Sequence, residues 1–144
     1  MATASTVSAF ESTLQKTHTW LKDLNDELSW PESDHQRAYH ALRAVLHALR
    51  DRLSAEESSD FAAQLPMLIR GFYYEGWNPA RTPIPARTRT EFLEHVAQNL
   101  QYELYHDEEE VTRAVFRVVG YHVTLGEIDD VKHALPRSIR ELWS

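Results

Sequence analysis

The chain has 144 residues, of which 42% are hydrophobic and 26% charged, as is typical of one soluble globular domain that is long enough to bury a core. Its formal net charge of −7 disfavours nucleic acid as a partner, because a protein that binds phosphates usually presents a basic face. It contains no cysteine, which excludes disulfides, thiolate zinc sites and thiol nucleophiles and is compatible with a cytoplasmic location.

Composition also indicates the kind of fold. Only four glycines stand among many alanines, leucines, glutamates and arginines, a bias that favours helix over strand. No window approaches the roughly 18 apolar residues of a membrane span. The first residues lack the basic and apolar segments of a signal peptide. We therefore expect an all-α cytoplasmic protein with no membrane partner.

Two helices are predicted before residue 54. The first begins at a capping box, either Ser8-x-x-Glu11 or Ser12-x-x-Gln15, and stops ahead of Pro31. Its apolar positions are Leu14, Trp20, Leu21, Leu24 and Leu28. The second helix is capped by Ser33-x-x-Gln36 and carries one broad apolar face. The arginines that flank this face are Arg37, Arg43, Arg50 and Arg52.

Two shorter helices follow, and then a linker. A Ser54-x-x-Glu57 box predicts a helix over residues 55–64. Pro66 fits the first turn of a fourth helix, which carries Leu68, Ile69 and Phe72 and ends near Gly76. The three prolines of residues 78–88 forbid a continuous helix, so this segment is a stiff linker.

The second half of the chain repeats the pattern of the first. A Thr88-x-x-Glu91 box starts it, and Thr124-x-x-Glu127 and Leu135-Pro136 lie 70 positions after Ser54-x-x-Glu57 and Leu65-Pro66. The apolar positions of the two halves also match. At a distance of 72 residues, Trp20, Leu21, Leu24 and Leu28 match Phe92, Leu93, Val96 and Leu100. At a distance of 70 residues, Ala41, Val45, Leu46, Leu49 and Leu53 match Val111, Val115, Phe116, Val119 and Val123.

These patterns predict an all-α fold with two tandem homologous helical repeats, packed into one compact bundle-like domain over residues 1–144. Repeat 1 covers about residues 12–77, the proline-rich linker residues 78–88, and repeat 2 about residues 89–143. Each repeat alone would be marginally stable, so the two should share one core. The valine-rich residues 115–123 also suit a strand, but the repeated capping box and the helical spacing favour helix.

The chain resembles the bacterial family catalogued as domain of unknown function 2267, over roughly residues 12–143. The segments that carry the resemblance are Trp20-Leu21-Lys22, residues 41–53, Ala63-Gln64-Leu65-Pro66, residues 70–77, His122-Val123-Thr124 and Gly126-Glu127-Ile128. The resemblance implies an all-helical duplicated domain in a bacterial protein, and it supplies no catalytic residues.

Eight histidines raise the question of a metal site. Glu32-x-x-His35, Glu103-x-x-His106 and Asp130-x-x-His133 have the spacing of ligands in di-iron bundles, but the first two fall at predicted turns, and solvated turn residues explain them better. His40, His47 and His122 are the other candidates, since a pseudo-twofold arrangement of the repeats would bring them together. The alternative for each is a half-buried histidine that bonds a carbonyl or a carboxylate.

Residues 70–77 form the best candidate interaction segment, through Arg70, Phe72, Tyr73, Tyr74 and Trp77. Four aromatic side chains in six residues exceed what one helix face buries. They either contact a partner protein or a second copy of the chain, or seal the seam between the repeats. Arg70 and Arg140 occupy equivalent positions, and each should form a salt bridge with the aspartate ten residues earlier, Asp60 or Asp130.

No Gly-x-Ser-x-Gly elbow or glycine-rich phosphate loop occurs, so we expect neither catalytic residues nor a cofactor. The leading hypothesis is a non-enzymatic protein-interaction or self-association module, and no residue argues for the stress-related role that we also considered. Self-association could use a basic strip, Arg81, Arg87 and Arg89, and an acidic cluster, Glu103 and residues 107–110. The alternative is a small-molecule or metal-binding protein with a site at the repeat interface.

Overall fold

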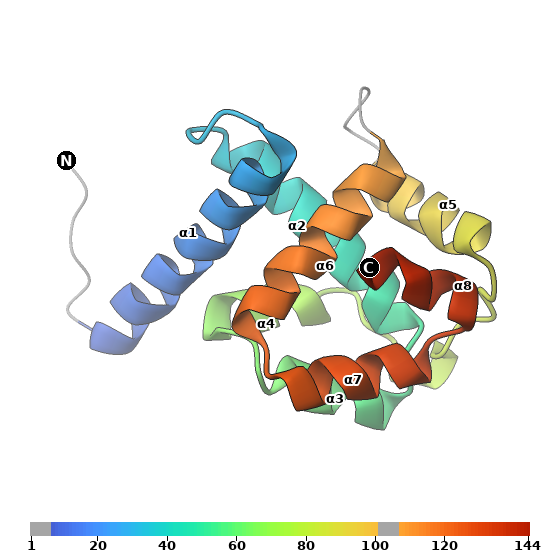
Figure 1. Cartoon of the computed structure of the whole chain (residues 1–144). Coiled ribbons are helices and arrows are strands. Elements are labelled where there is room, and N and C mark those ends of the chain that lie inside the picture. The colour runs from blue at the N-terminus through green and yellow to red at the C-terminus, as the bar shows by residue number, and fades with distance from the viewer. Residues whose placement is uncertain (1–6, 101–106) are drawn as a thin grey trace.

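The computed structural model describes residues 7–100 and 107–144 of the chain (Figure 1). Within these ranges all regular structure is helical and no strand occurs, which confirms the all-α prediction. The elements are α1 (Ser8–Leu28), α2 (His35–Asp51), α3 (Ala55–Ala62), α4 (Met67–Tyr74), the 3₁₀ turn η1 (Pro79–Arg81), α5 (Arg89–Asn99), α6 (Glu108–His122), α7 (Leu125–Ala134), α8 (Arg137–Arg140) and the 3₁₀ turn η2 (Glu141–Trp143).

The helix α2 lies at the centre of the molecule. It contacts α1, α4, α5 and α6, and residues 44–50 are all buried. The helix α6 packs on both α1 and α2, and α3 packs beside α7 (Figure 1). One apolar core therefore receives side chains from both halves of the chain. The valines of α6 suit a strand by propensity, but as a helix they form one buried stripe against this core.

Three of the predicted caps are confirmed. Ser54 and Glu57 form both hydrogen bonds of a capping box, Thr88 accepts from the Glu91 N–H, and Thr124 accepts from the Glu127 N–H. The Thr124 N–H itself donates to the side-chain oxygen of Gln64, at 3.1 Å, so this cap also ties the two halves together.

Two other predicted caps are wrong. α1 begins after Val7 with no side-chain cap, and Ser8 and Ser12 already lie within the helix. At α2 the cap is Asp34 instead of Ser33, and its carboxylate accepts from the Arg37 N–H at 3.1 Å. A carboxylate satisfies the free donors of a first turn and also interacts favourably with the positive end of the helix.

The linker between the halves crosses the carboxyl end of α2. The Ile84 N–H donates to the Asp51 carbonyl at 2.7 Å, and the Arg52 guanidinium donates to the Ile84 carbonyl. Its prolines leave room only for the short turn η1. None of the described helices combines the length and the apolarity that a membrane crossing requires.

Candidate interaction site

The predicted aromatic segment lies largely inside the fold. Phe72 and Tyr73 are buried, and the Tyr73 hydroxyl shares a 2.7 Å hydrogen bond with Ser58, while burial raises the pKa of Tyr73. Tyr74 and Trp77 are half-buried and pack against each other with ring centroids 5.0 Å apart. Phe72 and Tyr73 therefore pack in the core, and the interaction role of the segment stays a prediction.

Arg70 and Arg140 bind backbone carbonyls at the ends of α3 and α7. Arg70 donates to Ala62 and Leu65 at 3.0 and 2.9 Å, and Arg140 donates to Lys132 and Leu135 at 2.8 and 3.1 Å. The salt bridges predicted with Asp60 and Asp130 are wrong, since no ion pair joins them in the described residues. A helix end leaves carbonyls without intrahelical donors, and the forked guanidinium satisfies two of them.

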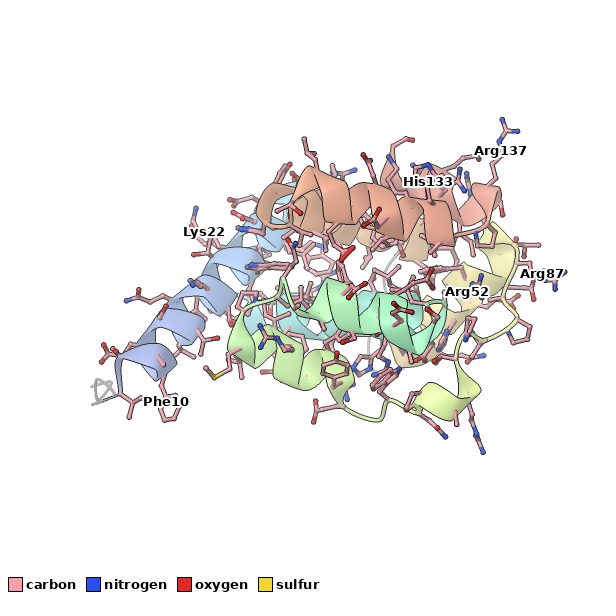
Figure 2. All side chains as sticks on the ribbon, turned by 90° about the horizontal axis from the view of Figure 1, so that it is seen from below. Phe10, Lys22, Arg52, Arg87, His133 and Arg137 are labelled. Carbon is pink, nitrogen blue, oxygen red and sulfur yellow. The ribbon has the colours of Figure 1, made fainter. Side chains whose placement is uncertain are left out.

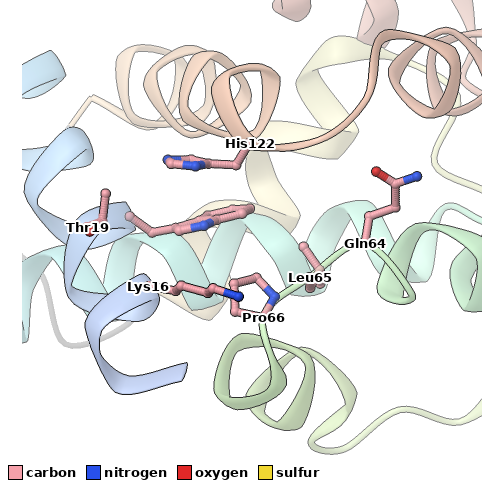
Figure 3. Close-up of a pocket in the computed structure, with 7 residues that line it drawn as sticks. Lys16, Thr19, Gln64, Leu65, Pro66 and His122 are labelled. Atoms are coloured by element: carbon pink, nitrogen blue, oxygen red, sulfur yellow. The ribbon is translucent and has the colours of Figure 1, made fainter. Parts of the chain in front are cut away.

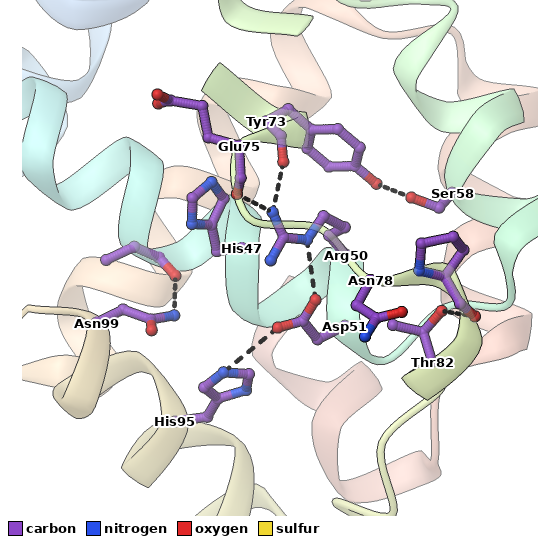
Figure 4. Close-up of polar contacts among 12 residues, drawn as sticks. His47, Arg50, Asp51, Ser58, Tyr73, Glu75, Asn78, Thr82, His95 and Asn99 are labelled. Atoms are coloured by element: carbon purple, nitrogen blue, oxygen red, sulfur yellow. Dashed lines mark hydrogen bonds and ion pairs between the residues drawn. The ribbon is translucent and has the colours of Figure 1, made fainter. Parts of the chain in front are cut away.

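A buried polar network holds the end of α4 on α2 (Figure 4). The Arg50 side chain is only 5% exposed, although its position predicts a flank of the helix. Its Nη1 donates to the carbonyls of Tyr73 and Glu75, both at 2.8 Å, and its Nε donates to Asp51 at 2.9 Å. On the other side of Asp51, His95 of α5 lies 3.6 Å away. The network therefore links α2, α4 and α5.

His47 belongs to the same region. Its Nε2–H donates to the Phe72 carbonyl at 2.7 Å, which fixes the proton on that nitrogen. Burial lowers the pKa of His47 to about 4, and the charges of Arg50 and Arg43 act in the same direction. Burial also lowers the pKa of His95. Both imidazoles are therefore neutral at pH 7.

The histidines expected to meet lie in separate environments, so that prediction is wrong. His47 is in the buried network, His40 contacts Gln36 one turn earlier, and His122 bonds Asp23 at 2.8 Å while stacking on Trp20. In residues 7–100 and 107–144 no group of three potential ligands is placed to hold a metal ion.

The structure also shows the surroundings of two of the pairs with Glu-x-x-His or Asp-x-x-His spacing. Glu32, in the turn before α2, and His35, the first residue of α2, are both exposed. His133 donates to the Asp129 carbonyl at 2.7 Å. The prediction for Glu103 and His106 lies outside the described residues.

Of the basic strip, Arg89 forms ion pairs within the chain, with Glu141 at 2.9 Å and with Glu109 at 3.6 Å.

A hollow of about 430 Å³ lies between the two halves (Figure 3). Lys16 and His122 reach it from α1 and α6. Its lining consists of Lys16, Thr19, Trp20, Gln64, Leu65, Pro66 and His122. A pocket at this interface was predicted with His40, His47, His122 and aromatic side chains; of the three histidines only His122 lines the hollow, beside the aromatic Trp20.

A second and more apolar groove lies between α1 and α4, and we call it the α1–α4 groove. It has a volume of about 550 Å³. Leucine and aromatic side chains form its walls, and His18, Gln36 and Glu75 form its polar edge. Its lining consists of Leu14, Thr17, His18, Leu21, His35, Gln36, Tyr39, Leu68, Gly71, Phe72 and Glu75.

The first half of α1 extends beyond the body of the molecule (Figures 1 and 2). Figure 2 shows Phe10 near the free end of this extension. A single stripe with alternating spacings of three and four runs along α1: Val7, Phe10, Leu14, Thr17, Leu21, Leu24 and Leu28. The last four residues are buried, whereas Phe10 is 55% and Leu14 49% exposed.

The stripe meets one more exposed side chain near the start of α4. Leu68 is 41% exposed, and its N–H donates to the Thr13 hydroxyl of α1 at 2.8 Å, whereas the exposed Met67 lies on another side of α1, with Ala9, Ser12 and Lys16. We call Phe10, Leu14 and Leu68 the overhang face. Leu14 and Leu68 also line the α1–α4 groove, so the face and the groove form one continuous surface.

Sequence reasoning missed this surface although a signal for it was present. The spacing from Phe10 to Leu28 follows one helix face without interruption. Periodicity shows which residues share a face, but it does not show how much of that face the remaining chain covers.

Comparison with known proteins gives one positive result. No curated protein matches the chain. A family model described as an uncharacterised conserved protein, DUF2267, matches residues 17–142, so Phe10 and Leu14 lie ahead of the matched part. The chain therefore belongs to the DUF2267 family.

Proposed function

We propose that this protein is a non-enzymatic helical module of the bacterial cytoplasm that binds a partner protein in the α1–α4 groove. The observation that carries the proposal is the apolar groove, whose walls continue into the exposed overhang face. Scattered surface leucines need no explanation, but contiguous apolar side chains beside a groove are typical of an interaction site.

The shape of the groove favours a helix as its occupant. Leu14 and Leu21, two turns apart on α1, and Leu68 and Phe72, one turn apart on α4, form two of its sides, and α2 completes the groove with Tyr39. Such a groove accepts the apolar face of an amphipathic helix, while polar groups at the edge set its orientation. His18, Gln36 and Glu75 supply such groups here.

The use of the buried polar groups supports a non-enzymatic role. The groups whose pKa values are most shifted are His47 and Tyr73, and they bond the Phe72 carbonyl and the Ser58 hydroxyl. Shifted pKa values often mark active sites, but structural networks shift them as well. Here the hydrogen bonds fasten α4 to α2 and α3.

The test is site-specific photo-crosslinking in the native host. A photo-reactive amino acid at position 68, in the groove, should yield a defined adduct with a protein. The same residue at position 125 is the control, because Leu125 is 79% exposed and lies outside the groove. A position 68 that yields no adduct beyond the level at position 125 would refute the proposal.

A second candidate function is the binding of a small organic anion in the hollow between the halves. The observation that favours it is the placement of Lys16 and His122 around the buried indole of Trp20. Titration with small carboxylic acids, followed by amide NMR, should shift the signals of Trp20 and Gln64 selectively. Equal shifts in wild type and Lys16→Ala would argue against this site.

We also infer that the two halves descend from one duplicated helical unit. Arg70 and Arg140 make corresponding bonds to the ends of α3 and α7. Ser54 and Thr124 cap those helices at matching positions, and α3 packs against α7. These matched local contacts support a shared origin because they involve the same offset of 70 residues as the apolar pattern.

A further inference from the structure

We infer that the occupant of the α1–α4 groove is the overhang of α1 from a second copy of this chain, so that the protein forms a twofold symmetric dimer. This inference rests on the proposed function, since it names the partner for the same surface. Three properties of the surface support it: its shape, its area and its charge.

The shape is complementary to itself. The overhang of α1 is a ridge that presents Phe10 and Leu14, and the groove begins directly beside it at Leu14 and Leu68. A twofold axis places the same patch of both subunits face to face. A patch that contains both a ridge and an adjoining groove can then insert each ridge into the other groove, which buries the apolar stripe of both copies.

The exposed area fits a dimer of modest affinity. Three side chains that are each about half exposed offer on the order of 250–300 Å² of apolar surface per copy. Two such faces together stay below the roughly 1,200 Å² of standard-size specific interfaces, in the range of weak and transient contacts. We therefore expect a dissociation constant on the order of micromolar to tens of micromolar.

The charges of the surface permit two acidic chains to approach. Residues 8–18 of α1 carry one acid and one base, Glu11 and Lys16, and residues 67–75 carry Arg70 and Glu75. Both segments are formally neutral in a chain with a net charge of −7, so the local repulsion between two copies is small here. Salt screens the remaining repulsion, so the dimer should tighten as salt is added.

Salt therefore separates this dimer from one that joins the basic strip to the acidic cluster. An interface between opposite charges weakens at high salt, whereas an apolar interface between like-charged chains strengthens. Sedimentation equilibrium of the full chain at low and high salt should show a monomer–dimer equilibrium that shifts toward dimer at high salt.

Two variants should break the dimer without harming the fold. Leu14→Glu places a charge on the ridge at a half-exposed position. Gly71→Gln places a side chain in the groove, and a Cβ at Gly71 meets nothing within 4 Å, so the monomer accommodates it. Each should raise the dimer dissociation constant about tenfold or more.

The chain supplies a matched control for each variant. Leu125→Glu changes an exposed leucine outside the surface, and Gly120→Gln changes a helical glycine whose Cβ also meets nothing within 4 Å. Neither control should change the dissociation constant. Urea unfolding of all four variants checks that any loss of dimer does not come from a loss of folded protein.

The absence of native cysteine permits a second measurement. A spin label on Ser12→Cys, which lies on the overhang on the face of α1 opposite the stripe, should report a shorter distance between copies than a label on Leu125→Cys. The dipolar signal at position 12 should disappear with Leu14→Glu.

A monomer at all concentrations, a dimer unaffected by Leu14→Glu and Gly71→Gln, or a dimer that weakens with salt would each overturn the inference. Crosslinks from position 68 to a different protein, together with a monomeric chain, would retain the groove as an interaction site and remove the second copy as its occupant. The absence of any crosslink would remove both.

Discussion

The first helices of the two halves differ in length at one end. α1 begins at Ser8, three turns ahead of the buried Trp20, whereas α5 begins at Arg89, less than one turn ahead of the buried Phe92. The core covers both helices from these aromatic residues onward, but only α1 continues past it. The second half shows that a helix of this type can complete the core without an overhang, so the overhang needs another explanation, which contact with a second copy provides.

The second helices differ in a complementary way. Arg50 of α2 is buried and holds the end of α4, and 70 positions later Gly120 of α6 is exposed. His47 likewise corresponds to Arg117, 70 positions later in the sequence. Arg117 forms an exposed ion pair with Glu27 at 2.8 Å. The first half therefore contains a buried polar network that residues 89–100 and 107–144 of the second half lack. α4 continues to Tyr74, so its last carbonyls need donors from α2.

The largest expected effect comes from removing the centre of this network. Arg50→Ala should lower the free energy of unfolding by about 3 kcal/mol or more, because it leaves two carbonyls and the Asp51 carboxylate without their donor. Urea denaturation measures it. Gly120→Ala, at the matching position, should instead raise stability by less than about 1 kcal/mol. Similar losses in both variants would contradict the contrast between the halves.

Acid should destabilise the first half through His47. Its pKa of about 4 in the folded chain lies below the unfolded value near 6.5, so the unfolded chain binds the proton more readily. This contribution to stability is complete above about pH 6.5 and declines by about 2–3 kcal/mol as the pH falls toward 4. Unfolding measured across this range should show it.

His47→Gln isolates the contribution of this one residue. Its amide can still donate to the Phe72 carbonyl, but it does not titrate, so the pH slope should become flatter. Hydrogen exchange should locate the acid effect in α4. A slope that is unchanged in His47→Gln would assign the acid sensitivity to other groups, such as His95.

The smallest effects should come from the two arginines at the helix ends. Arg70→Ala and Arg140→Ala should each cost about 1–2 kcal/mol, since each loses hydrogen bonds to two carbonyls. The lysine variants keep the charge but lose the fork, so they should recover only part of this loss. Unfolding curves that differ by well over 1 kcal/mol between the two alanine variants would weaken the case for duplication.

Local chemistry explains which parts of the fold were predictable. The caps at Ser54, Thr88 and Thr124 act within one helical turn, so the sequence alone identifies them. The choice of Asp34 over Ser33 was missed because two adjacent residues both suit a cap. The burial of Phe72 and Tyr73 could be determined only from the fold, since an aromatic cluster suits a core and an interface equally well.

The sequence by itself determined the helical content, the helix order and the residues that share each face, because spacing, capping and proline act between neighbours in the chain. Only the tertiary structure decided that Arg50 is buried, that His40, His47 and His122 stay apart, and that Phe10 and Leu14 are uncovered. Burial depends on which distant segments pack against a helix. In α1 that packing ends partway along the apolar stripe, and the proposed interaction surface begins there.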